Sequence, residues 1–213
     1  MVPATTLRKY APGTLLLLLY GFLSLLMAGI VLQYIPAGTD TAFLGIKQDY
    51  IDTPFYLVAF YIHVFTAILA LPAGATQFSS AIRRHYPAVH RVNGRLYVLA
   101  IVLLGGPSGF FIGLFANGGI ASRISFCLLG VLWIFFTWQA YRKARQGDFI
   151  AHKAFMYRSF ALTLSALTLR AWKLALVPLF HPHPMDLYRI IAWLGWIPNL
   201  LIAEYLISKM QRK

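Results

Sequence analysis

The sequence predicts an all-α, polytopic integral membrane protein, folded as one bundle of six transmembrane helices. The first observation is composition: 59% of the residues are hydrophobic and only 12% are charged, about half the charge of a typical soluble domain. The second is length, because a helix needs about 20 apolar residues to cross roughly 30 Å of hydrocarbon. Six stretches approach that length, at residues 14–34, 55–80, 96–115, 124–138, 155–179 and 188–207. They leave little of the 213 residues for a soluble domain.

The third observation is the placement of the cationic residues, which gather on one side of the implied membrane. That side receives Arg8, Lys9, Arg83, Arg84, Arg91, Arg95, Arg142, Lys143, Arg145, Lys153, Lys209, Arg212 and Lys213. The other side receives Lys47, Arg123 and Arg189. This pattern predicts cytoplasmic termini in the inner (plasma) membrane and a basic face against anionic headgroups. It also argues against nucleic acid as the reason for the net charge of +13.

The first two spans differ in character. Span 14–34 follows Arg8 and Lys9 but is too long for a signal-peptide core and ends in no small-x-small cleavage site, so we expect a retained signal anchor. An outer loop follows at 35–53, for which we expect either irregular structure or a short surface helix. The span at 55–80 contains Pro72, which we expect to kink it. Its small and polar residues recur on one face, which allows close approach of another helix or a flat cofactor: His63, Ala67, Ala70, Gly74, Gln77 and Ala81.

The remaining spans carry few polar residues. A basic loop, 83–93, precedes the span at 96–115. The span at 124–138 contains the only cysteine, Cys127, so no disulfide forms within the chain. The span at 155–179 has a polar stripe within about 40° of one face, formed with the residue just before it: His152, Ser159, Thr163 and Arg170. An extended Pro-rich loop leads to the span at 188–207, which contains Glu204, the only carboxylate in any span.

Two histidines are candidate cofactor ligands on the inner side. His90 and His152 both stand at the cytoplasmic entry of odd-numbered spans, and Arg95 and Arg158 lie near enough to pair with propionates. A bis-histidine b-type haem requires two imidazoles at equal depth on facing helices. We therefore expect His90 and His152 to come within reach of one shared ligand. The alternative for His90 and Arg95 is a basic membrane anchor.

A second group of polar residues belongs to the outer half. His63 and Arg170 lie at nearly the same height by helical rise, and each is on the small or polar face of its span. We expect the second and fifth spans to be neighbours and these two residues to border a polar pocket, completed by Asp52 or Glu204. Gln77, near the carbonyl freed by Pro72, is a further candidate cofactor contact. The alternative is that Arg170 reaches the outer headgroups while His63 bonds a backbone carbonyl.

Short motifs follow one another in a definite order along the chain. They are Gly74-x-x-Gln77-Phe78 after the intramembrane His63, then His90-Arg91-x-x-Gly94-Arg95-x-Tyr97, His152-x-x-x-Met156-x-Arg158-Ser159, and Thr168-Leu169-Arg170. This order resembles the bacterial predicted membrane protein family catalogued as domain of unknown function 2306, over about residues 55–173. The resemblance implies a multi-span helical membrane protein and supplies no catalytic assignment.

These observations leave two classes of function open. One is a b-type haem or quinone redox module with its site at the inner histidines and arginines. The other is a small transporter, or a lipid- or anion-binding membrane protein, without redox activity. An intramembrane metal hydrolase is less favoured and no metal site is predicted, because Glu204 is the only carboxylate within a span. The sequence leaves the substrate, the redox partner, the oligomeric state and enzymatic activity open.

The charge pattern makes a direct prediction about orientation. A reporter enzyme that is active only in the cytoplasm, fused after Lys213, should be active in intact cells. A periplasm-specific reporter at the same position should be silent. The opposite result would overturn both the orientation and the even number of spans.

Overall fold

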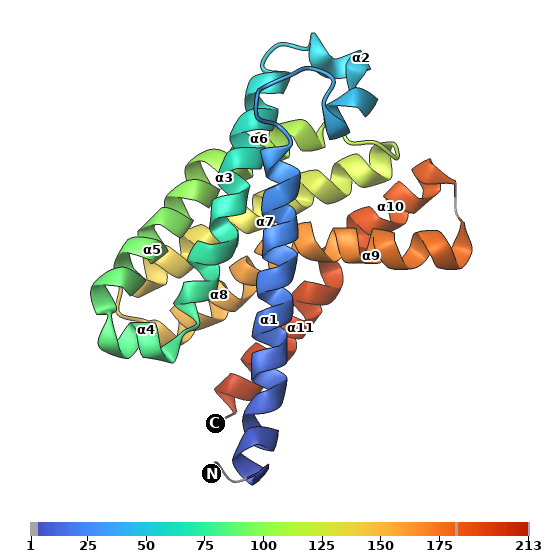
Figure 1. Ribbon diagram of the computed structural model, residues 1–213. Coiled ribbons are helices and arrows are strands. Elements are labelled where there is room, and N and C mark those ends of the chain that lie inside the picture. The colour runs from blue at the N-terminus through green and yellow to red at the C-terminus, as the bar shows by residue number, and fades with distance from the viewer. Residues whose placement is uncertain (1–3, 182, 213) are drawn as a thin grey trace.

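The computed structural model describes residues 4–181 and 183–212, and for residues 4–14 it describes the backbone alone. The side chains of Arg8 and Lys9, and all of Lys213, therefore lie outside the described part of the chain. Within that part the fold is entirely helical (Figure 1). The helices are α1 (Ala4–Leu32), η1 (Ala42–Ile46), α2 (Gln48–Ile51), α3 (Tyr56–Gln77), α4 (Ser80–His85), α5 (Pro87–Leu99), η2 (Ala100–Gly105), α6 (Gly106–Gly113), α7 (Ile120–Arg145), α8 (Phe149–Thr163), α9 (Ser165–Phe180), α10 (Pro184–Leu194) and α11 (Ile197–Gln211).

The predicted class is confirmed, since five helical segments are long and apolar enough to cross a membrane. They are α1, α3, the α5–η2–α6 segment, α7 and the α10–α11 segment. The pair α8 and α9 makes a sixth candidate, bent by 42° at its break. The protein is thus a polytopic membrane protein with five or six spans. The bend also means that the stripe expected from His152 to Arg170 does not lie along one straight helix.

Two connections that we expected to be loops are partly or wholly helical. The basic segment after α3 forms α4, whose first turn is capped by the Ser79 hydroxyl accepting from the Ile82 amide at 3.2 Å. It continues into α5, which has Pro87 in its first turn, where a missing N–H costs nothing. Pro184 likewise starts α10 instead of extending the outer loop. The candidate ligand His90 consequently stands on a helix.

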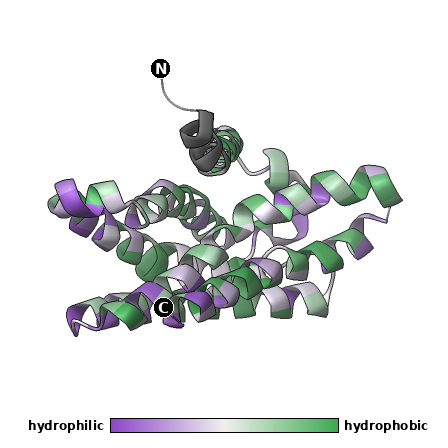
Figure 2. Ribbon diagram, turned by 90° about the horizontal axis from the view of Figure 1, so that it is seen from below, coloured by the Kyte–Doolittle hydropathy of each residue, from purple (hydrophilic) through white to green (hydrophobic). Residues whose placement is uncertain are grey.

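The long helix α7 is central to the bundle and packs against α6 on one side and α8 on the other. The helix α3 packs along the α5–η2–α6 segment and also contacts α8, so the expected contact between the second and fifth spans is present. The helix α1 packs against α3 and α9 and lies at the edge of the bundle (Figure 2). The beginning of α1 and the end of α11 lie at the same end of the molecule, opposite α2 (Figure 1).

A chain of hydroxyl groups ties the core of the bundle together. Tyr97 on α5 is fully buried, and its hydroxyl lies 2.8 Å from Ser159 Oγ and 2.7 Å from Thr163 Oγ1, both on α8. Trp133 on α7 donates to Thr163 Oγ1 at 2.9 Å, and Thr137 Oγ1 lies 2.6 Å from Ser159 Oγ. Three spans are thus joined by hydrogen bonds between uncharged groups, which satisfy one another away from water.

The register of this network has a geometric consequence. Along α5 and α8, His90 and His152 each stand seven residues before the hydrogen-bonded Tyr97 and Ser159, or about two helical turns. Both helices run in the same direction, because they belong to the third and fifth spans. Helical geometry therefore gives the two histidines similar positions relative to this hydrogen bond, each on about the same side of its helix as the bonded residue.

We predict that Tyr97→Phe destabilises the fold, because it leaves Ser159 and Thr163 with one fewer buried partner. The expected loss is about 1 kcal/mol of unfolding free energy, read from denaturant unfolding in detergent. Tyr205→Phe is the matched control, since Tyr205 is exposed on α11. Equal stability of the two variants would contradict a role for the network.

Candidate functional site

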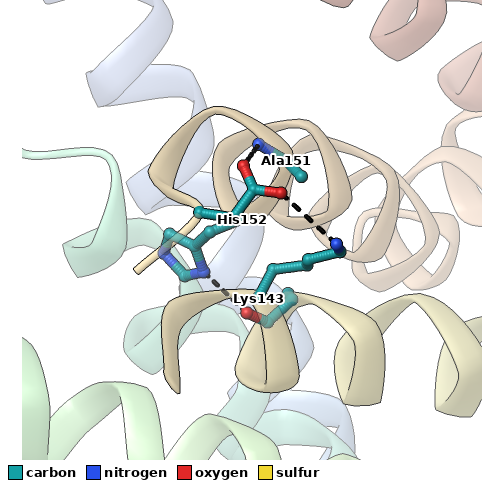
Figure 3. Close-up of polar contacts among 5 residues, drawn as sticks. Lys143, Ala151 and His152 are labelled. Carbon is teal, nitrogen blue, oxygen red and sulfur yellow. Dashed lines mark hydrogen bonds and ion pairs between the residues drawn. The ribbon is translucent and has the colours of Figure 1, made fainter. Parts of the chain in front are cut away.

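The inner histidine site is built around the start of α8 (Figure 3). Asp148 caps this helix by accepting a hydrogen bond from the Ala151 amide at 3.1 Å. It also pairs with Lys143 at the end of α7, with 3.3 Å between Nζ and Oδ2. The Ala151 amide, followed by Lys143, lowers the pKa of the Asp148 carboxyl. The turn between α7 and α8 is thereby fixed, and with it the position of His152.

The orientation of the His152 ring is set by α7. Its Nδ1 atom lies 2.8 Å from the Ala140 carbonyl oxygen (Figure 3). Because a carbonyl can only accept, Nδ1 carries the proton, and a neutral ring then keeps its lone pair on Nε2. This is the arrangement found in metal-ligating histidines, which donate their second ring nitrogen to a carbonyl or carboxylate. The hydrogen bond thus fixes the ring orientation of His152 and, in the neutral ring, leaves Nε2 unprotonated.

His90 faces the same region from α5. Its Nδ1 atom is buried and has no hydrogen-bond partner within the described residues. His90 and His152 lie within electrostatic range of each other. Along their described lengths α5 and α8 do not pack closely backbone to backbone. Tyr97 instead bridges the space between them.

The two candidate arginines differ in availability. Arg95 is exposed on α5 and forms no ion pair with any described residue. Arg158, which we expected to be free for a propionate, is held by Glu204 on α11 through two hydrogen bonds of 2.5 and 2.8 Å. Its guanidinium also lies over the rings of Phe155 and Phe136, at 5.4 and 5.9 Å. Arg158 therefore joins the fifth and sixth spans.

Gln77 positions His90. Its amide nitrogen lies 3.3 Å from the His90 carbonyl oxygen, so it donates from the end of α3 to α5. Its side-chain oxygen lies against Gly94, where a Cβ atom would come within 3.0 Å. The glutamine is almost fully buried, and these contacts fix the separation of the two helices. In this structure Gln77 fixes the backbone of the helix that presents the histidine.

His63 lies away from this inner site, at the break in the third span. Its Nδ1 atom lies 2.8 Å from the Gly105 carbonyl oxygen and therefore donates to it. The ring lies over Gly109, where a Cβ atom would approach it to 2.7 Å. The π-helical turn η2 ends at Gly105, just before Pro107, a residue that has no N–H to continue the ladder. His63 thus bonds a backbone carbonyl, as the alternative interpretation of the sequence expected.

Arg170, on α9 beyond the bend, is close enough to His63 for their charges to interact. It also lies near Tyr188 on α10 and Tyr34 at the end of the first span. Within the described part of the chain, Arg170 donates from one terminal nitrogen to the Ala166 carbonyl oxygen, at 2.8 Å. Glu204, which we expected to complete its pocket, is wrongly assigned, because that carboxylate bonds Arg158 instead.

Two further features bear on chemistry. In the described part of the chain no group of three or more His, Cys, Asp and Glu side chains is arranged to hold a metal ion. A cleft of about 360 Å³ lies between α1, α3, α8 and α11. Its lining is mostly apolar and includes Tyr20, Phe78, Tyr157, Phe160 and Asn199. The size is that of a site for a small apolar molecule.

The comparison with known proteins agrees with this architecture. Residues 60–207 match the family described as predicted membrane protein, DUF2306. The chain belongs to this family. No curated protein and no solved structure matches it. The resemblance noted from the motifs is thus confirmed, and the match extends beyond them to residue 207 in α11.

Sequence reasoning did not identify the pairing of Arg158 with Glu204 or the role of Tyr97. A signal for the first was present, because a lone carboxylate in a span favours a cationic partner at its own depth. Arg158 stands nine residues into the fifth span from Phe149. Glu204 lies a similar distance before the end of α11 at Gln211. Their heights therefore match, since both distances start from the inner side.

We predict that single substitutions in this pair cost more than the double substitution. Glu204→Gln leaves the Arg158 charge uncompensated, with an expected loss of about 1–3 kcal/mol of unfolding free energy. Adding Arg158→Gln should restore part of that loss, because no unpaired charge remains. Denaturant unfolding of the four proteins in detergent gives the coupling energy. Strictly additive losses would show that the pair does not act as a unit.

Proposed function

We propose that this protein is a membrane redox module that binds one b-type haem between α5 and α8, through His90 and His152. The observation that carries the proposal is the Tyr97–Ser159 hydrogen bond, because it sets the register of the two helices. That register supports a placement of the histidines at equal depth on facing sides, which the proposal requires. Two such imidazoles are the ligand set of a low-spin b-type haem.

The surroundings of the histidines support this assignment. The Nδ1 atom of His152 is occupied by a backbone carbonyl, which leaves Nε2 as the ligating atom. Arg95 is uncommitted, and the neighbouring Arg91 is exposed on the same helix, so cationic groups are available for two propionates. Arg158 is paired with Glu204 and would support the haem site only indirectly, through the rings of Phe136 and Phe155 over which its guanidinium lies. When bound, the haem would supply one-electron chemistry at the inner end of the bundle.

A second candidate function is binding of a lipid or quinone without haem. The apolar cleft between α1, α3, α8 and α11 favours it, because its size suits a ring or an acyl chain. The cleft borders Phe78 and Phe160, and Phe160 also lies against Gly74, so it adjoins the core that carries Tyr97. A quinone there would be a neighbour of the inner site. The two candidates are therefore compatible in space.

The test is spectroscopic. The protein is produced with a haem supply, purified in detergent and titrated with hemin, and its oxidised and reduced absorbance is recorded. We expect a Soret band with a reduced α-band, at about one haem per chain. His152→Ala and His90→Ala should each abolish the low-spin spectrum, whereas His85→Ala, which removes an exposed histidine on α4, should retain it.

Size-exclusion profiles of the variants separate loss of ligation from loss of folding. A wild-type protein that stays colourless after hemin addition would overturn the haem assignment. Extraction of the same colourless preparation, with identification of a bound quinone or lipid by mass spectrometry, would then favour the second candidate. A spectrum unchanged in both histidine variants would contradict the ligand assignment.

A further inference from the structure

The outer end of α7 begins without the usual stabilisation of a helix N-terminus. The chain turns into it through Asn117, Gly118 and Gly119, and both glycines have positive φ values of 86° and 78°. Among the described residues no side chain caps the helix, and its first turn contains no acidic residue. The first amides of this 26-residue helix therefore have no partner within the described part of the chain, and no acidic side chain there compensates its positive dipole end.

Ser122, in the first turn of α7, points into this region without a partner. The residue is fully buried, yet its hydroxyl makes no hydrogen bond with the described residues. The hydroxyl is directed at the turn, because a Cβ atom placed on Gly118 would come within 2.5 Å of Ser122 Oγ. A buried hydroxyl without a partner costs free energy, so its presence requires an explanation.

Arg123 is the next residue, and a cation in the first turn opposes the helix dipole. One of its terminal nitrogens donates to the Tyr50 hydroxyl at 3.2 Å. Its Nε atom is buried and has no partner among the described residues. The guanidinium forms no ion pair within the described part of the chain. An unused donor and an unpaired positive charge thus belong to the same first turn of α7 as the unpaired hydroxyl.

A second cation, Lys47, is buried beside Arg123. It is 2% exposed, and its amine donates to the Phe115 carbonyl and, at 2.5 Å, to Asn117 Oδ1. It lies 5.2 Å from the centre of the Tyr50 ring, the residue that Arg123 also contacts. Burial, with a smaller contribution from Arg123, lowers the pKa of Lys47 to about 8, and Asp49 acts in the opposite direction. Two cations that repel each other are held at the end of α7 that already carries positive potential.

A third cation at this end, Arg189, is already paired with a carboxylate and holds the turn in place. Arg189 on α10 donates from Nε to the Gly118 carbonyl at 2.9 Å and pairs with Asp186 at 3.1 Å. The space beyond the turn is open, since Gly119 is exposed and a Cβ atom there would meet nothing within 4 Å. The turn is therefore fixed in place and reachable from the outer side.

We propose that the N-terminal turn of α7 is a binding site for a phosphate group, with Ser122, Arg123 and the first amides of the helix as donors. Lys47 contributes a buried positive charge and holds Asn117. One oxyanion would satisfy the hydroxyl, the guanidinium and the helix dipole together, and a tetrahedral phosphate has enough acceptor oxygens for all three. The site lies at the opposite end of the bundle from the inner histidines, so it stands independently of the haem assignment.

A phosphate group on the outer side of the membrane can come from two sources. They are dissolved inorganic phosphate and the phosphodiester of an outer-leaflet lipid. The protein is purified in a phosphate-free buffer and a sugar-based detergent. One arm titrates sodium phosphate at constant ionic strength and follows binding by calorimetry. The other arm adds a short-chain phosphatidylglycerol and counts bound lipids by native mass spectrometry. Each arm includes the wild type, Arg123→Gln, Ser122→Ala and, as a control, Arg84→Gln on the cytoplasmic helix α4.

The expected result is saturable binding of one anion per chain in at least one arm. Arg123→Gln should weaken it by about tenfold or more, and Ser122→Ala by a smaller factor. Arg84→Gln removes the same charge far from the site and should leave it unchanged. Binding in the first arm identifies dissolved phosphate as the ligand, and binding in the second alone identifies the lipid.

Two results overturn the proposal. One is the absence of saturable binding in both arms. The other is equal weakening by Arg84→Gln and Arg123→Gln, which would mean that only net charge attracts the anion. If Arg123→Gln does not fold, Ser122→Ala decides, because this substitution removes one hydroxyl and no charge. Unchanged affinity in a well-folded Ser122→Ala protein then counts against the site.

Discussion

In hydrocarbon, every polar group must find its partner inside the protein, and the fold of this bundle depends on that constraint. The third, fourth and fifth spans meet through hydroxyl and indole groups centred on Tyr97. The fifth and sixth spans meet through Arg158 and Glu204. Because these contacts are directional, they fix the register of the helices as well as their proximity. If only apolar side chains met between the helices, the helices would be freer to shift along one another, because lipid tails are as apolar as those side chains.

The two ends of the bundle resolve the constraint differently. At the inner end, carbonyls and a capped helix start hold one nitrogen of His152 and leave the other free, while Gln77 braces the helix that carries His90. At the outer end, the turn before α7 is built with donors in excess of acceptors. Imidazole nitrogens with unused lone pairs can bind a metal-centred cofactor. Hydrogen-bond donors without acceptors can bind an anion. The same principle is therefore the basis on which we propose different ligand classes for the two ends.

Breaks in the helices create the polar contacts of the outer half. The π-helical turn before Pro107 brings the Gly105 carbonyl to His63, and the bend between α8 and α9 redirects the segment that carries Arg170. Straight helices would have kept Arg170 on the face of Ser159 and Thr163. The bend instead places it among Tyr34 and Tyr188, within electrostatic reach of His63.

The sequence by itself determined the membrane class and the polar residues, because apolar length, charge asymmetry and rare intramembrane side chains are properties of composition and order. It also predicted equal depths for His90 and His152, since helical rise is constant along a span. Only the tertiary structure decided which polar groups meet: Glu204 bonds Arg158 and not Arg170, and Lys47 is buried beside Arg123. Partner choice depends on the rotation, bending and neighbours of each helix, and a linear pattern of one chain does not contain these three quantities.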